Sequence, residues 1–401
     1  MSCELIKESL EIKCSIVRGG TSKGIFIMEN ELPKDQCLRD RIILSIFGSP
    51  DLRQIDGLGG ADTLTSKLAI IGPSTREDAD VDYTFGQVSF VEKFIDYGGN
   101  CGNISSGVGV YAVDNGLVEA KEPITKVKVH LTNTNRILEV EVPVKNGRAL
   151  VNGDYKIDGV PGTGAKITLD WSDVVGGITG KLLPTGNPKD IIEIENESFE
   201  VSVVDAGNIV IFIKAESLGL VGIESALEID NNKELMRKIE RIRGEICYKL
   251  GLVNSWEEAA TKTPYQPFFA MVSKSQDYKC FNGIEVKKEE IDIVSRLVFM
   301  LKMHKTYPVT GTVATGAMAR VKGSIVYDLL SERGKNDLNV QIGHPGGIIP
   351  VEAEAEYSGE ECKITRLGVY RTARTILDGR VYVNTKNIKK YNFLGGNLYE
   401  L

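Results

Sequence analysis

The sequence predicts an α+β fold made of two related lobes, each with a buried helix. Three observations lead to this prediction. Strand-like segments dominate, and they do not alternate regularly with helices as they would around a parallel sheet. The glycine-rich segment 102–107 is echoed by segment 311–316, an offset of 209 residues (311 − 102). After each copy comes a strand–turn–strand pattern, over residues 127–141 and 339–353.

Composition places the chain among globular proteins and excludes several functional classes. Hydrophobic residues make up 42% and charged residues 26%, both ordinary values. A net charge of −7 argues against a general nucleic-acid binder. The seven cysteines are scattered without a C-x-x-C pair, and no apolar run is long enough to cross a membrane. We therefore expect a cytoplasmic protein with no membrane segment and no nucleic-acid partner.

The first expected elements are strands 12–17 and 25–28, joined by a loop over residues 18–24. This loop is basic and glycine-rich, so it could bind an anion, but a plain hairpin turn explains it equally well. A helix is expected over residues 34–47, and a strand over 68–71 follows Lys67. Lysine at this place either packs against the core or lies in water at the strand end. In the first case burial disfavours the ammonium and leaves a usable general base.

Strands are next expected over residues 81–85 and 87–95, ahead of a glycine loop that carries Cys101. The apolar segment 104–113 indicates a buried helix directly after this loop. The free backbone amides and the dipole of a helix start suit a carboxylate or phosphate, and they favour the thiolate form of a cysteine. The loop therefore predicts an anion site and a reactive group in one place.

The clearest domain boundary is the glycine- and proline-rich segment 176–188. We expect an N-terminal lobe over residues 1–182 and a C-terminal lobe over 183–401, with the strand near 380–401 packing back on the first lobe. Within the second lobe, strands are expected over 193–204, 209–214 and 267–273, and helices over 232–250 and 291–303. A second glycine loop, over residues 310–316, leads into a short apolar helix.

Several separate motifs, in this order, closely resemble the PrpF family: RGGTSKG at 18–24, GAD at 60–62 ahead of Lys67, GGNCGN at 98–103, GHPGG at 343–347 and RTAR at 371–374. The resemblance extends from about residue 12 to residue 384. Members of this family include 2-methylaconitate cis-trans isomerases, 3-methylitaconate delta-isomerases and oxalomesaconate tautomerases. The resemblance implies a diaminopimelate-epimerase-like fold, with two similar lobes that each wrap a mostly antiparallel sheet round a central helix and with the site between them.

The resemblance also implies cofactor-independent proton transfer, in which Lys67 matches the family's base and Cys101 its active-site cysteine. Isomerisation of an unsaturated acid removes an activated C–H proton and returns it elsewhere, and the helix starts at Asn103 and Thr312 could stabilise the enolate. We therefore expect a small polycarboxylate substrate and no cofactor. The remaining candidates for substrate binding are Arg18, Thr21, Ser22, Lys23, Asn100, Gly102, Asn103, His304, Thr310, Gly311, Thr312, His344 and Arg374. For six of these taken singly, a structural role is at least as good an explanation: Arg18, Ser22, Lys23, His304, His344 and Arg374.

Thr310 stands where the repeat, at its offset of 209, would place a second Cys101. Threonine does not titrate near neutral pH, so the two-thiol inversion of the related racemases and epimerases is disfavoured and a one-faced proton shift is favoured. Two alternatives stay open: a racemase or epimerase of the same fold, and an accessory protein for an aconitase-like iron–sulfur dehydratase. The three histidines are too far apart in sequence to suggest a metal site. The oligomeric state, including a homo-oligomer, is left open.

Overall fold

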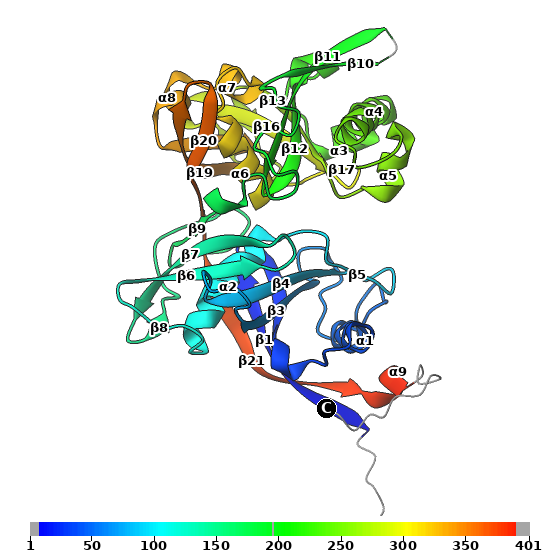
Figure 1. The fold of residues 1–401 in the computed structure, drawn as a ribbon, viewed down its shortest axis with the longest axis vertical. Helices are drawn as coiled ribbons and strands as arrows, with labels where there is room; N and C mark the ends of the chain where they lie inside the picture. The colour runs from blue at the N-terminus through cyan, green and yellow to red at the C-terminus, as the bar shows by residue number, and fades with distance from the viewer. Residues whose placement is uncertain (1–7, 195, 390–401) are drawn as a thin grey trace, which may run out of the picture. The chain divides into compact units, whose positions relative to one another are not determined.

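The computed structural model describes residues 8–194 and 196–389 (Figure 1). Its contacts divide the chain into two compact units. Unit 1 contains the described residues up to 167 together with those from 371 onward, and unit 2 contains residues 168–370. The sequence-based division was 1–182 and 183–401. Residues 168–182 therefore group with unit 2, and the last strand groups with unit 1.

The sheet of unit 1 is mostly antiparallel, with parallel pairing at two places. The strands follow the order β21, β1, β2, β3, β4, β6, β7, and the two parallel pairs are β2–β3 and β4–β6. The short strands β5 and β8 pair antiparallel with the ends of β4 and β7. The bounds are β1 Ser9–Gly19, β2 Ser22–Met28, β3 Lys67–Pro73, β4 Val81–Val88, β5 Ile95–Asp96, β6 Ile124–Leu131, β7 Arg136–Lys145, β8 Arg148–Ala149 and β21 Ala373–Asn384.

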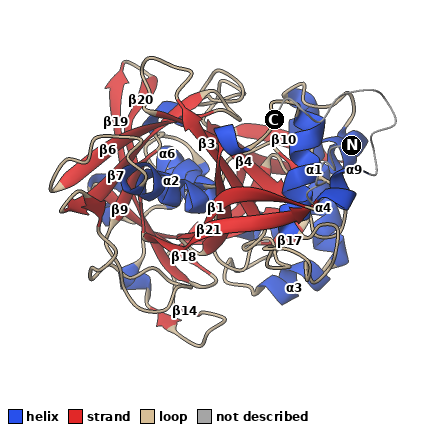
Figure 2. Cartoon of the chain, turned by 90° about the horizontal axis from the view of Figure 1, so that it is seen from below, coloured by secondary structure: helices blue, strands red, loops and turns tan. Residues whose placement is uncertain are grey.

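Two helices cover opposite faces of this sheet. Ile43 and Ile46 of helix α1 (Gln36–Phe47) belong to the same hydrophobic cluster as Leu68 and Ile70, even-numbered residues of β3. Helix α2 (Gly102–Asp114) contacts the other face and is surrounded by strands β1, β2, β3, β6, β7 and β21 (Figure 2). Because side chains alternate along a strand, the odd-numbered residues of β3 point toward α2. The remaining short helices of this unit are η1 (Glu29–Glu31) and α9 (Thr385–Lys389).

Unit 2 repeats the same strand topology. Its strands follow the order β10, β11, β12, β13, β16, β18, β19, β20. The parallel pair β12–β13 corresponds to β2–β3 of unit 1, and the parallel pair β16–β18 corresponds to β4–β6. The bounds are β10 Asp190–Ile194, β11 Glu197–Ala206, β12 Asn208–Lys214, β13 Phe268–Lys274, β16 Ile293–Phe299, β17 Lys302–Met303, β18 Asn339–His344, β19 Gly347–Ser358 and β20 Glu361–Arg371. Strand β9 (Ile167–Asp170) lies at the boundary, and β14 (Tyr278–Lys279) pairs with β15 (Glu285–Val286).

The helices of unit 2 occupy corresponding places in the chain. Helix α4 (Lys233–Lys249) comes between β12 and β13 in the chain, as α1 comes between β2 and β3. Helix α6 (Val309–Met318) precedes the strand pair β18–β19, as α2 precedes β6–β7. The predicted repeat of strands around a buried helix is therefore confirmed. The shorter helices are η2 Ser172–Val174, η3 Ala215–Leu218, α3 Ala226–Asn231, η4 Trp256–Glu258, α5 Ala259–Lys262, η5 Lys288–Glu290, α7 Ile325–Leu329 and α8 Glu332–Asn336.

One predicted helix is wrong. Residues 291–303 form strands β16 and β17 instead of a helix. Every residue of β16 from Ile293 to Val298 is buried, because the strand lies in the middle of the sheet and is covered on both faces. A strand buried on both faces loses the alternation that marks a half-exposed strand, so its apolar pattern resembles that of a helix.

Candidate active site

Lys67 is the first residue of β3, and its side chain is buried, with 8% exposed. Of the two expectations for this lysine, packing against the core is therefore correct. Its Nζ donates a hydrogen bond of 2.8 Å to Oε1 of Gln87 and lies 5.3 Å from the centre of the Phe85 ring. No carboxylate pairs with this amine anywhere in residues 8–194 and 196–389. The amine thus has one neutral acceptor and one aromatic face as its partners.

The register of the sheet shows which face carries this lysine. Lys67 lies opposite Gly24 on β2 and opposite Gln87 on β4. Cross-strand neighbours point to the same face of a sheet. At Gly24 a Cβ atom would lie 3.0 Å from Cδ1 of Ile104, which belongs to the first turn of α2. The lysine amine therefore lies on the α2 face, toward the start of that helix.

Cys101 is the N-cap residue of α2, with an extended backbone (φ −118°, ψ 100°), and its thiol is half-buried. Its carbonyl oxygen accepts hydrogen bonds from the backbone N–H of Ser105 at 2.9 Å and the hydroxyl of Ser105 at 3.0 Å. The side chain of Cys101 forms no capping hydrogen bond at this helix start, nor does any other side chain in the described part of the chain. The backbone amides of the first turn are therefore available to an anion, and the thiol stands at their edge.

A buried tyrosine lies beside this cysteine. Burial, and next the proximity of Cys101, raise the pKa of Tyr83 well above its ordinary value. Tyr83, Phe85 and Gln87 alternate along β4 on the face that carries Lys67. One strand therefore provides the neighbours of both the lysine and the cysteine.

The hairpin over residues 18–24 closes against the first turn of α2. A Cβ atom at Gly19 would lie 2.3 Å from the backbone oxygen of Asn103, and one at Gly20 would lie 2.2 Å from its Oδ1. Asn103 donates through Nδ2 to Oγ1 of Thr21 at 3.0 Å and accepts at Oδ1 from Nε of Arg371 at 2.9 Å. The hairpin and the helix start are thus joined through one amide side chain.

Arg371, which the sequence analysis did not select, contacts the candidate residue Asn103. The side chain of Arg371 is buried, with 6% exposed, and burial lowers its pKa to about 10. The motif at 371–374 contains two arginines, and we expected Arg374 to bind substrate. Arg374 is exposed on β21, opposite Arg18 on β1. What distinguishes Arg371 is its hydrogen bond to Asn103, 268 positions away in the sequence, and this contact can be seen only in the fold.

The other candidates of unit 1 surround the same hairpin and helix start. Arg18 donates through Nη1 to the carbonyl oxygens of Gly20 (3.1 Å) and Thr372 (2.6 Å), and burial followed by the charge of Arg374 lowers its pKa. These bonds link Arg18 to the hairpin and to the segment before β21. The hydroxyl of Ser22 is buried and has no hydrogen-bond partner within the described chain. Its neighbour Lys23 is half-buried. Asn100 is buried and donates through Nδ2 to Oγ1 of Thr134 at 2.9 Å.

In unit 2 the candidates gather at the start of α6. Oγ1 of Thr310 accepts a hydrogen bond of 2.7 Å from Nδ2 of Asn208, which fixes its hydroxyl. His344 is buried, accepts from the backbone N–H of Gly346 at Nδ1 and stacks on Tyr307 at 6.3 Å between ring centres. His304 accepts in the same way from the N–H of Thr306 at 3.1 Å. Gly311 and Thr312 lie in the first turn of α6, which no side chain caps.

The structure corrects the alignment of the two copies. At Gly109 of α2 a Cβ atom would contact Val140, the fifth residue of β7, and at Gly316 of α6 it would contact Val351, the fifth residue of β19. The offset between the helices is therefore 207 residues (316 − 109), not 209. Thr310 is the second residue of its helix and corresponds to Asn103, and the N-cap that corresponds to Cys101 is Pro308. The conclusion that the second copy lacks a thiol is unchanged.

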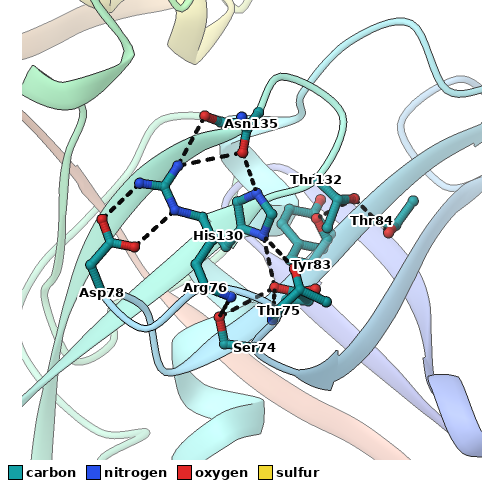
Figure 3. A network of polar contacts seen from close by, with 10 residues as sticks. Ser74, Thr75, Arg76, Asp78, Tyr83, Thr84, His130, Thr132 and Asn135 are labelled. Carbon is teal, nitrogen blue, oxygen red and sulfur yellow. Dashed lines mark hydrogen bonds and ion pairs between the residues drawn. The ribbon is translucent and has the colours of Figure 1, made fainter.

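The third histidine, His130, belongs to a separate polar network (Figure 3). Its Nδ1 lies 2.8 Å from Oδ1 of Asp82, and its Nε2 lies 3.0 Å from Oδ1 of Asn135. Arg76 donates to the same Asn135 oxygen at 3.4 Å, and this fixes the orientation of the amide. Both ring nitrogens therefore lie within hydrogen-bond distance of side-chain oxygens. No group of three or more metal-binding side chains occurs in the described residues.

A family profile described as "PrpF protein" matches residues 9–384 of this chain. The chain belongs to the PrpF family. It is 49% identical over 379 residues to the 3-methylitaconate isomerase of Eubacterium barkeri, covering 94% of this chain and 98% of the relative. It is 33% identical to the 2-methyl-aconitate isomerase of Shewanella oneidensis, over 96% of this chain and 99% of that protein. The PrpF resemblance predicted from the motifs is confirmed.

A solved structure, "Crystal Structure of Methylitaconate-delta-isomerase", superposes with a TM-score of 0.87 at 47% identity, covering 98% of this chain and 100% of the other. A hydroxyproline epimerase from Agrobacterium vitis shares the fold, with a TM-score of 0.53 at 12% identity and 94% of each chain covered. The predicted α+β, epimerase-like fold class is thereby confirmed. No helix among the described residues is both long and apolar enough to cross a membrane.

Proposed function

We propose that this protein is a cofactor-independent isomerase of small unsaturated di- or tricarboxylic acids, and that 3-methylitaconate is its first candidate substrate. One observation carries the proposal. The amine of Lys67 is buried on the α2 face, its hydrogen-bond acceptor is a neutral amide, and no carboxylate in the described residues pairs with it. An amine without a carboxylate partner can release its proton and act as a base.

The chemistry follows from the substrate. In 3-methylitaconate the acidic C–H carbon lies between a carboxylate and the carbon of a terminal C=CH2 group. The amine of Lys67 takes this proton, and the electron pair spreads over the carboxylate and the double bond. A proton added to the CH2 carbon then produces a methyl group and an internal double bond. Lys67 returns this proton, or the thiol of Cys101 supplies it.

Negative charge grows on the carboxylate during the first step. The uncapped first turn of α2 supports stabilisation of this charge, because its backbone amides are free and the positive end of the helix dipole lies there. Arg371 and Asn103 adjoin the same turn and are candidates for holding a carboxylate.

The choice of first substrate rests on sequence similarity. The relatives named for methylitaconate are 49% and 47% identical to this chain, and those named for 4-oxalomesaconate and 2-methyl-aconitate are 37% and 33% identical. A two-thiol racemase is less well supported, because Pro308 occupies the N-cap of α6 and the chain has no second thiol there.

Proton NMR of the acid in deuterium oxide tests the proposal. Wild-type protein is expected to convert the vinylidene signals of 3-methylitaconate into new methyl signals, and Lys67→Ala is expected to lower the rate by about 10²–10⁴-fold. Lys126→Ala is the matched control, since its ammonium is largely exposed and pairs with Glu139. Retained activity in Lys67→Ala would contradict the role of the lysine. No reaction with methylitaconate, methylaconitate, aconitate or oxalomesaconate would reject the isomerase and favour an accessory role.

A further inference from the structure

Gln87 is held in one orientation by the backbone. Its Nε2 donates to the carbonyl oxygens of Ser66 at 3.1 Å and Thr63 at 3.3 Å. Reversal of the amide would turn its oxygen toward two carbonyl oxygens, so the nitrogen must face them. Oε1 therefore points to Nζ of Lys67 and accepts its hydrogen bond of 2.8 Å.

The backbone that orients Gln87 is itself well anchored. The carbonyl oxygen of Ser66 also accepts from the N–H of Val88, and the hydroxyl of Ser66 donates to Oε1 of the buried Gln54 at 2.6 Å. The carbonyl oxygen of Leu64 accepts from the N–H of Lys23. The segment before Lys67 is thus joined to both neighbouring strands, and the amide of Gln87 has little freedom to turn.

A neutral acceptor suits a lysine that must change its charge. Oε1 accepts an N–H from an ammonium and also, more weakly, from an uncharged amine, so a hydrogen bond remains after loss of the proton. In the uncharged amine one N–H is directed to Gln87, and this restricts the lone pair to the two remaining staggered positions. A carboxylate at the same place would favour the ammonium.

The other groups packed around the amine do not replace this interaction. Strand β4 adds the uncharged ring of Phe85, and β2 adds Gly24. The titratable groups on neighbouring elements are Asp96 of β5, opposite Gln87, and Cys101 at the start of α2. Asp96 accepts the N–H of Gly98 at 2.7 Å and forms no ion pair with Lys67 in the described residues.

The second copy of the repeat shows that the fold does not need this polar pair. Phe268 is the first residue of β13, as Lys67 is of β3. The register Phe269↔Val298 puts Phe299 one step further on, opposite Phe268, and the two rings pack with centres 5.6 Å apart. An apolar pair therefore occupies the place of Lys67 and Gln87 in a sheet of the same topology. The sheet topology therefore does not require the Gln87 amide in unit 1, and we look for a role of this amide in the chemistry of Lys67.

We propose that Gln87 is a positioning residue for Lys67: its amide, fixed by two backbone carbonyls, orients the amine and favours the charged form less than a carboxylate would. The proposal rests on the proposed function, in which Lys67 is the base. It predicts that substitution of Gln87 alters the protonation behaviour and the turnover of the enzyme more than its folding.

Two variants of Gln87 and one control test this in the full-length protein. Gln87→Met keeps the length of the side chain and removes the hydrogen bonds, and Gln87→Glu places a carboxylate beside the amine. Gln276→Met is the matched control, because the amide of Gln276 also donates to a backbone carbonyl, that of Val221 at 2.8 Å, but belongs to unit 2. The first readout is kcat and KM against pH with 3-methylitaconate. The second needs no substrate: trace acetylation of Lys67 with acetic anhydride from about pH 6 to about pH 11, followed by peptide mass spectrometry.

Gln87→Met is expected to lower kcat by about tenfold or more and to change KM less. Gln87→Glu is expected to move both the acid limb of kcat/KM and the midpoint of Lys67 acetylation up by about one pH unit or more. Gln276→Met is expected to leave kcat and both pH midpoints in place. If both Gln87 variants match wild type in the two pH readouts and in kcat, or if Gln276→Met reproduces their effects, the positioning role is wrong.

The two readouts separate this inference from the proposed function. A wild-type protein that isomerises none of the acids, but whose Lys67 acetylation midpoint moves in Gln87→Glu, refutes the function and supports the positioning role. A wild-type protein that isomerises methylitaconate and loses this activity in Lys67→Ala, with Gln87 variants unchanged, supports the function and refutes the positioning role.

Discussion

Replacement of Gly19 by alanine tests whether the close contact between the hairpin and α2 matters for both folding and catalysis. A Cβ at this position would lie 2.3 Å from the backbone oxygen of Asn103 and 3.1 Å from Oγ of Ser106. Real Cβ contacts stay beyond 3.0 Å, so the hairpin and the helix start must separate by at least 0.7 Å. Because the obstacle at 2.3 Å is backbone, no side-chain rotation can relieve it.

The size of the effect follows from this displacement. Overpacking of a tight contact costs about 1–3 kcal/mol of unfolding free energy. A displacement near 1 Å at a catalytic site lowers turnover by up to about a hundredfold. Gly19→Ala is therefore expected to unfold at lower urea concentration and to isomerise 3-methylitaconate roughly ten- to a hundredfold more slowly. Urea unfolding followed by circular dichroism and the NMR rate measure the two quantities separately.

Gly379→Ala is the matched control for this prediction. Gly379 is also a strand glycine of unit 1, on β21, but the nearest atom to an added Cβ is Cδ2 of Leu377 at 3.6 Å, an ordinary contact. Its unfolding free energy is expected to stay within about 0.5 kcal/mol of wild type. If Gly19→Ala unfolds and turns over like Gly379→Ala, the hairpin does not press on the helix start as the structure describes.

Three further predictions concern stability. Burial raises the pKa of Tyr307 to about 12 from its ordinary value of 10.0, so the folded state keeps the phenol proton to higher pH than the unfolded state does. The resulting stability is fully present below pH 10 and is lost as pH rises through 12, by about 1.4 kcal/mol per pH unit. Urea midpoints in this pH range should therefore fall less steeply in Tyr307→Phe. Asp292→Ala removes a fully buried carboxylate that accepts from Ser331, Arg333 and the N–H of Gln341, and it should lower the unfolding free energy by about 3 kcal/mol; an unchanged urea midpoint would contradict this. His130→Phe leaves Asp82 buried without its imidazole and should cost about 1–3 kcal/mol, whereas equal stability in urea would show that the hydrogen bond between His130 and Asp82 contributes nothing.

Sequence reasoning recovered the features that are written locally in the chain. The glycine loop around Cys101 and the apolar segment after it predicted a helix start, and α2 begins at Gly102. The periodic charged segment 232–250 predicted α4, which covers Lys233–Lys249. Of the two explanations for loop 18–24, the hairpin is present, with Gly19 paired to Ser22. Each of these features depends on neighbours within a few residues, which is where sequence patterns carry information.

Features that depend on distant contacts could not be predicted. Gln87 is 20 positions from Lys67, and only the register of β3 and β4 brings them together. Arg371 contacts Asn103 across 268 positions, and the sequence offered no reason to prefer it to Arg374. The repeat offset failed for the same reason. Small and apolar residues recur often enough to align two helices in more than one register, and only the contacts of Gly109 and Gly316 with the following strand decide between them.

The corrected alignment explains how a duplicated fold can carry chemistry in one copy. At the three places compared, unit 1 has Cys101, the pair Lys67 and Gln87, and Asn103, where unit 2 has Pro308, the pair Phe268 and Phe299, and Thr310. Proline and phenylalanine neither accept nor donate a proton, and the hydroxyl of Thr310 is bound to Asn208. Inversion of a carbon centre by two thiols would need a titrating group from each copy. A double-bond shift needs one base and one acid, and we propose that Lys67 and Cys101 in the first copy provide both, so the second copy is free to conserve the topology without the proton-transfer groups.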